Sequence, residues 1–185
     1  MGVLRQYQTY HAISLEHWSI VWSGDTYSKL LVKDYPSEYL VSDDYVTDNP
    51  ASFIYPSSYA SKYYLDGIAE GHISIFNTST TNDDNGTVTQ YGVKLESLDN
   101  NGSEPTTIFD ITRSVSSEGS VPSSDYLSLP IYATIDKKLV EADQKLRLTI
   151  SFAGADPSSG NLYIACANDS ANVDVEIRVP YAPSG

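Results

Sequence analysis

The three histidines of this chain are the side chains best suited to acid–base or metal chemistry near neutral pH. His11 and His17 lie six positions apart, with no acidic or cysteine pair at metal-ligand spacing, and His72 is remote from both in sequence. No His-Glu-x-x-His or comparable zinc pattern occurs. We therefore interpret all three histidines as surface or packing residues.

The many serines raise the question of nucleophilic catalysis. The chain contains no Gly-x-Ser-x-Gly sequence, which would place a serine on a sharp strand-to-helix turn. It also contains no glycine-rich loop of the kind that cradles a phosphate. A catalytic triad is recognised by its geometry, and no spacing in the sequence points to one. We expect no catalytic residue, and hence a protein that is not an enzyme.

Acidic residues in turns are the remaining candidates for holding a metal. The segment Asn-Asp-Asp-Asn-Gly at 82–86 resembles a calcium loop, but its oxygens are contiguous instead of alternating, and no glutamate closes it. A hairpin turn is the favoured interpretation, with a loose Ca²⁺ site as the alternative. The same holds for Asp43, Asp44 and Asp48. We expect no metal and no cofactor.

Aromatic side chains offer a different chemistry, which is contact with a partner. Ten of the 15 tyrosines precede residue 65, and both tryptophans lie there too. Tyrosine gives a wide contact area at low side-chain entropy cost and is enriched at interfaces. One alternative is that these rings pack within their own domain, and another is that they form a platform that stacks on sugars. The predicted partner-binding residues are Tyr7, Tyr10, Trp18, Trp22, Tyr35, Tyr39, Tyr45, Tyr55 and Tyr59.

The elements that position these residues are predicted from hydrophobic alternation. Leu146, Leu148, Ile150 and Phe152 alternate with polar residues, which is the pattern of a strand with one wet face. Such strands need a second sheet or a closed barrel to cover their apolar faces. We predict an all-β antiparallel sandwich, jelly-roll-like, from eight strands: 11–22, 71–77, 88–98, 106–115, 126–135, 145–153, 161–167 and 172–180.

Two local features refine this prediction. Pro130 lies within the strand predicted at 126–135, and it marks either an edge strand or a bulge because proline cannot donate to the ladder. Residues 136–144 are the one helical candidate, with Asp136 as a cap and Leu139 and Val140 facing inward.

Residues 1–65 differ from the rest of the chain. Prolines at 36, 50 and 56, with several aspartates, interrupt regular structure, yet the aromatics argue against disorder. We predict an extended N-terminal arm at 1–65, ordered by lying on another molecule, and a β-sandwich domain at 66–185.

Charge and composition exclude several classes of partner. The formal net charge of −13 repels phosphates, so we expect no nucleic acid. No apolar run approaches a membrane span, and no secretion signal opens the chain. The single Cys166 cannot form an internal disulfide and is interpreted as a small core residue.

The alternating strands at 146–152 and 173–179, the Asn/Gly turns at 99–103 and 157–161 and the aromatic arm together resemble the head decoration (cement) proteins of tailed bacteriophages. The resemblance implies a non-enzymatic, trimeric virion protein, made in the host cytoplasm, that binds the major capsid protein or other virion proteins and stabilises the head. A tail or baseplate protein and a carbohydrate-binding β-sandwich module remain the alternatives.

Overall fold

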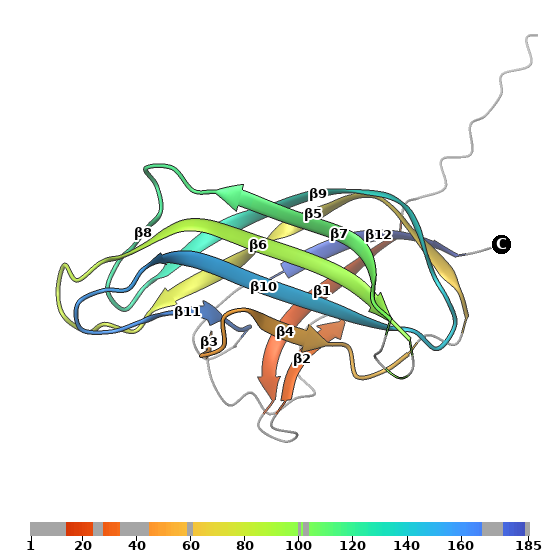
Figure 1. Ribbon diagram of the computed structural model, residues 1–185, viewed down its shortest axis with the longest axis horizontal. Coiled ribbons are helices and arrows are strands. Elements are labelled where there is room, and N and C mark those ends of the chain that lie inside the picture. The colour runs from red at the N-terminus through yellow and green to blue at the C-terminus, as the bar shows by residue number, and fades with distance from the viewer. Residues whose placement is uncertain are drawn as a thin grey trace, which may run out of the picture.

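The computed structural model describes residues 14–23, 28–33, 45–58, 61–99, 101, 104–167 and 176–183. Twelve strands and no helix are found in these ranges (Figure 1). The strands are β1 (Ser14–Ser23), β2 (Ser28–Lys33), β3 (Tyr45–Val46), β4 (Ala51–Ile54), β5 (Tyr63–Asn77), β6 (Gly86–Leu98), β7 (Thr106–Ser114), β8 (Ser120–Val121), β9 (Tyr126–Val140), β10 (Lys145–Ala155), β11 (Leu162–Ala165) and β12 (Glu176–Pro183).

The strands form two antiparallel groups that face each other as layers (Figure 1). One group has the order β3-β11-β5-β12-β1-β2, with β9 paired to the other side of β5, and the second has the order β4-β10-β6-β7, with β8 on β6. A single parallel pair, Leu30 on β2 with Ile54 on β4, joins the two groups. The predicted all-β antiparallel sandwich is confirmed, and the joined layers give it a nearly closed, barrel-like form.

The core lies between the layers and consists of the inward side chains of nearly every strand. Alternation of buried and exposed residues is clearest in β9 and β10, as expected for strands with one wet face. Cys166 is fully buried, which agrees with its interpretation as a core residue. The largest fully buried side chains are Trp18, Phe53, Ile20, Leu31, Leu65, Ile73, Ile75, Ile135, Leu146, Leu148, Ile150 and Ile164.

Side chains, and not a backbone ladder, hold the free edge of β9 against the other layer. The Tyr91 hydroxyl on β6 donates to the carbonyl of Pro130 at 2.5 Å, and Arg113 Nη2 on β7 donates to the carbonyl of Tyr132 at 3.2 Å. Burial raises the pKa of Tyr91 above its ordinary value of 10.0, and the charge of Arg113 opposes that shift. β9 pairs only with β5 among the described strands, so the edge position predicted from Pro130 is confirmed.

Each of the eight predicted strands overlaps an observed strand, but the predicted helix is wrong. Residues 136–140 continue β9, and a turn at 141–144 leads into β10. The pairing of β9 with β5 shifts register beside Asp136, and Lys137 has a φ of 26°. A bulge therefore breaks the alternation and places consecutive polar residues where a helical pattern was inferred.

The predicted arm at 1–65 needs correction for its described part. β1 pairs with β12 and β2, β3 pairs with β11, and β4 pairs with β10. Trp18, Ile20, Leu31 and Phe53 are buried in the same core as the later strands. These strands belong to the sandwich, because their apolar faces find partners far along the same chain. Residues 1–13 lie outside the described residues.

Candidate functional site

A cleft of about 310 Å³ opens beside the short strand β3. Trp22 lies at the end of β1, and Lys29 lies opposite it at the start of β2. Tyr45 of β3 forms another wall, and Thr47 and Asp48 follow directly after that strand. The cleft thus brings two aromatic rings together with an ammonium group, a carboxylate and a hydroxyl.

The charged groups of the cleft are paired with each other. Lys29 Nζ lies 2.5 Å from Asp48 Oδ2 and 5.7 Å from the centre of the Trp22 ring. The Asp48 side chain is 56% exposed, so this ion pair remains open to water. The pair ties the segment after β3 to the β1–β2 hairpin, and it leaves carboxylate and ammonium groups beside the indole face.

Tyr45 belongs to a row of half-buried aromatic rings on the outer face of β11, β5 and β9. Its ring stacks on Tyr163 with centroids 4.9 Å apart and planes 10° apart, and on Phe76 at 5.5 Å. The ring centroids of Phe76 and Tyr126 are in turn 4.7 Å apart. Tyr163, Phe76 and Tyr126 are direct cross-strand neighbours, so the ladder fixes their positions.

A second cleft, of about 390 Å³, shares Thr47 with the first and is bordered by Tyr163. Its wall includes Asn49, whose side chain donates to the carbonyl of Phe152 at 2.8 Å and accepts from the amide of Phe152 at 3.1 Å. These two hydrogen bonds to β10 anchor the segment after β3. Asn161 also lines the second cleft, and its side chain is exposed.

The structure separates the predicted partner-binding residues into different groups. Trp22 and Tyr45 meet in the first cleft. Trp18 is only 2% exposed and packs in the core, where the Tyr55 ring meets it edge-on at 4.9 Å, so Trp18 is not a surface contact. The other predicted positions lie outside the described residues: Tyr7, Tyr10, Tyr35, Tyr39 and Tyr59.

Sequence reasoning missed most of the polar groups of the two clefts. Lys29 and Asn161 carry no signal of their own, because Lys29 reaches its cleft through the β1–β2 hairpin and Asn161 through the long-range pairing of β11 with β5. Tyr163 could have been found, since it takes the polar phase of an alternating strand and is aromatic. Asp48 was interpreted as a turn residue, with a loose Ca²⁺ site as the alternative, and in the structure it pairs with Lys29.

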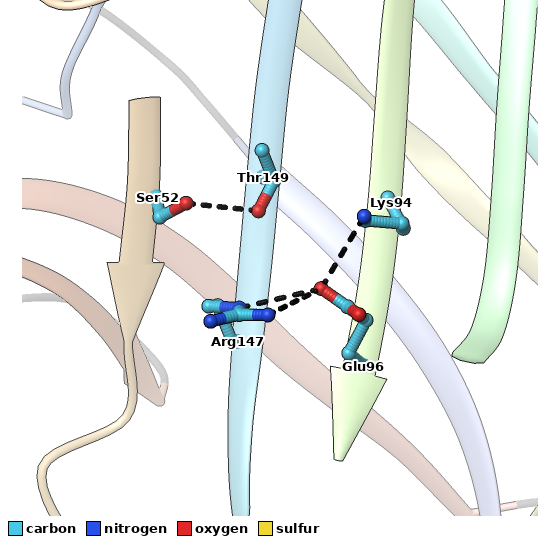
Figure 2. A network of polar contacts seen from close by, with 5 residues as sticks. All are labelled: Ser52, Lys94, Glu96, Arg147 and Thr149. Carbon is cyan, nitrogen blue, oxygen red and sulfur yellow. Dashed lines mark hydrogen bonds and ion pairs between the residues drawn. The ribbon is translucent and has the colours of Figure 1, made fainter. Parts of the chain in front are cut away.

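A second polar cluster lies on β4, β10 and β6 (Figure 2). Arg147 Nη2 and Nε lie 3.0 and 3.3 Å from Glu96 Oε1, and Lys94 Nζ lies 3.6 Å from the same oxygen. The hydroxyls of Ser52 and Thr149 are 3.0 Å apart in the adjoining row. Glu96 is 4% exposed, and a carboxylate so buried needs paired cations. The cluster therefore holds Glu96 in place and fixes the register of three strands.

The turn at 82–86 connects β5 of one layer with β6 of the other, so it is not a hairpin. The carboxylate of Asp84 accepts from Ser79 Oγ at 2.6 Å and from the amides of Ser158 and Ser159 at 2.7 and 2.8 Å. The Ser79 bond is the largest cause of a lowered pKa at Asp84; burial opposes it, and the two amides add to the lowering. The carboxylate thus binds the protein's own donors.

Asn77 ties the same turn to a third segment. Its side-chain nitrogen donates to the carbonyls of Asp84 and Val121, both at 2.9 Å, and its side-chain oxygen accepts from the amide of Ser79 at 2.9 Å. Asn77 is fully buried, so these bonds replace its contacts with water. The polar network at this end of the molecule is structural.

The histidines and acidic residues form no metal cluster of three or more ligands within the described ranges. His17 is exposed, and its Nδ1 lies 2.6 Å from Glu176 Oε1, within hydrogen-bond distance. His72 is half-buried on β5, and His11 falls outside the described ranges. Among the residues with described positions, no helix is long and apolar enough to cross a membrane.

Comparisons with known proteins show similarity of structure only. No protein-family model matches the chain, and no curated protein matches it in sequence. A CocE/NonD family hydrolase from Staphylococcus aureus matches over 93% of this chain and 37% of its own length, with a TM-score of 0.60 and 10% identity. A second structure of a CocE/NonD family hydrolase from this organism matches over 72% and 30%, with a TM-score of 0.50 and 12% identity.

A viral capsid structure, the VP2 subviral particle of infectious bursal disease virus, matches over 83% of this chain and 41% of its own. Its TM-score is 0.26 at 14% identity, which is too low to carry an argument. The chain spans only 37% of the hydrolase it resembles, so the likeness concerns one part of that protein. In the arrangement of its strands, the chain is similar to this part of a CocE/NonD family hydrolase.

Proposed function

We propose that the chain is a non-catalytic carbohydrate-binding β-sandwich module whose sugar site is the cleft beside β3. The observation that carries the proposal is the meeting of Trp22 and Tyr45 with Lys29, Asp48 and Thr47 in one open cleft. Ligand sites commonly combine apolar and aromatic walls with a few polar groups that fix orientation.

The chemistry of a sugar fits this lining. One face of a pyranose ring consists of C–H groups, which pack well on the electron-rich face of an aromatic ring. Its hydroxyls need hydrogen-bond partners once they leave water, and the cleft offers the carboxylate of Asp48, the ammonium of Lys29 and the hydroxyl of Thr47. Aromatic and polar groups are therefore available on the same ligand-sized surface.

The cleft is also held in place by the protein. Asn49 bonds twice to the backbone of Phe152, Asp48 bonds to Lys29, and Tyr45 stacks on Tyr163. Affinity suffers when a site must be ordered on binding, so anchors of this kind favour recognition of a small ligand.

The test is a glycan array probed with the full chain, followed by calorimetric titration of the glycans that bind. The Trp22→Ala variant is expected to lose at least about tenfold in affinity, as for an anchor residue at the centre of a binding site. Tyr132→Ala is the matched control, because Tyr132 is 55% exposed on β9 and lines neither cleft.

Absence of binding to every glycan on the array would overturn the proposal. Equal losses in the Trp22 and Tyr132 variants would also count against it, because they would show that the cleft is not the site. Far-ultraviolet circular dichroism of each variant ensures that a loss of binding is not a loss of fold.

Assembly into a virion is the second candidate, and an exposed apolar surface favours it. Leu15, Ile68 and Tyr132 are 47%, 41% and 55% exposed, and all three lie on the layer that contains β1, β5 and β9. Burial of these side chains against another protein would be favourable. Sedimentation analysis tests this role: a trimer that dissociates in a Tyr132→Glu variant supports it, and a monomer at all concentrations refutes it.

A further inference from the structure

We infer that the sugar site continues past Thr47 into the second cleft, so that the preferred ligand is an oligosaccharide and not a single sugar; this rests on the proposed function. Thr47 lines both clefts, which makes them neighbours along one surface. Tyr45 borders the first cleft and Tyr163 the second.

The two tyrosines join the clefts as a stacked pair of rings. Their rings are nearly parallel, with planes 10° apart and centroids 4.9 Å apart. Tyr163 pairs with Phe76 across the ladder, so the sheet fixes the place from which its ring projects. A chain of sugars that spans both clefts reaches both rings, whereas a single sugar reaches only one of them.

The second cleft offers hydrogen-bonding groups that the protein does not use itself. The side chains of Thr47 and Asn161 make no hydrogen bond within the described part of the chain, and both residues are exposed. By contrast, Asn49 is committed to Phe152, and Asp156 Oδ1 accepts from the amide of Leu162 at 2.9 Å. Thr47 and Asn161 are therefore the groups available to the hydroxyls of a second sugar.

The backbone of Asn161 keeps the position fixed when its side chain is changed. Its amide donates to Thr78 Oγ1 at 3.0 Å, and its carbonyl accepts from the amide of Thr78 at 3.0 Å. Asn161→Ala keeps both bonds, so this variant should remove the side-chain amide without disturbing the fold. Asn101→Ala is the matched control, because Asn101 is exposed in the connection between β6 and β7 and lines neither cleft.

The experiment titrates the full chain with chito-, cello- and malto-oligosaccharides of one to six sugars. In the series that binds, affinity is expected to rise at least about tenfold from the single sugar to the longer members and then level off. Asn161→Ala is expected to remove most of that rise while leaving the affinity for the single sugar unchanged. Asn101→Ala is expected to keep the full rise.

The outcomes distinguish failure of the extended site from failure of the proposed sugar-binding function. An affinity that is the same for all lengths, or a rise that persists in Asn161→Ala, overturns the extended site but leaves a sugar site at Trp22 standing. Failure of every series to bind, together with an array on which no glycan binds, overturns the proposed function itself.

Discussion

Replacing Trp18 by alanine should mainly lower the stability of the fold, whereas replacing Trp22 by alanine should mainly weaken binding. Trp18 is 2% exposed in the core, whereas Trp22 is half-buried and lines the cleft. Removing a buried tryptophan costs about 3–5 kcal/mol through lost burial and the cavity left behind. The loss for Trp18→Ala includes its edge-on contact with Tyr55, a type of contact that contributes about 0.5–1.5 kcal/mol.

The expected loss of about 4 kcal/mol lowers the melting temperature by about 8–16 °C for a chain of this size. Trp22→Ala removes a partly exposed ring and is expected to cost about 1 kcal/mol. Trp18→Phe provides a gentler change: it keeps an aromatic ring and removes Nε1, which has no hydrogen-bond partner among the described residues. Its cost should therefore fall well below that of Trp18→Ala.

Urea denaturation followed by circular dichroism measures all three variants, and glycan titration of the folded proteins completes the comparison. Trp18→Ala that is as stable as the parent chain would refute the placement of β1 in the core. Trp22→Ala that unfolds as easily as Trp18→Ala would refute the assignment of Trp22 to the cleft surface.

Three further predictions concern the polar groups that join the layers. Asn77→Ala should lose about 3 kcal/mol in urea denaturation because three hydrogen bonds are lost, two of them buried, whereas the exposed control Asn82→Ala should stay within about 0.5 kcal/mol. Because the pKa of Asp84 is lowered in the folded state, its carboxylate contributes to stability fully above pH 3.8, and this contribution is lost as the pH falls through the folded-state pKa. Asp84→Asn, whose amide group has only one accepting oxygen, should therefore shrink the loss of stability measured between pH 7 and pH 3. Because the pKa of Tyr91 is raised in the folded state, its neutral hydroxyl contributes to stability below pH 10.0, and this contribution is lost as the pH rises through the folded-state pKa. Tyr91→Phe should cost about 1 kcal/mol at pH 7, and its melting temperature should fall less at alkaline pH than that of the parent chain.

Much of the fold could be predicted from the sequence because alternation is a local signal. The pattern of Leu146, Leu148 and Ile150 marks β10 regardless of which strands lie beside it. β3 and β8 have two residues each, which is too short for any period to show. The helix at 136–144 was predicted wrongly because a bulge at Asp136 and Lys137 interrupts a strand, and a sequence pattern does not distinguish that interruption from a helical face.

The candidate site was less predictable, since it depends on pairings between distant segments. Trp22 and Tyr45 were named from their residue type, but their meeting depends on β3 pairing with β11 and on β1 pairing with β2. The proline-containing segment was predicted to be an arm because its partners are not visible locally. The ion pair of Asp48 could not be predicted for the same reason, because its partner Lys29 lies 19 positions away, on β2.

The pairing of β1 with β12 also constrains how the chain can fold as it is synthesised. β1 ends at Ser23 and β12 begins at Glu176, so a ribosome adding about 5–20 residues per second leaves β1 waiting roughly 8–30 s for its neighbour. Until then only β2 can pair with it in the ladder. Because β12 inserts between β5 and β1, one of the most central strands arrives last. Nascent chains halted before Glu176 should therefore expose Trp18 to chaperones or to proteolysis.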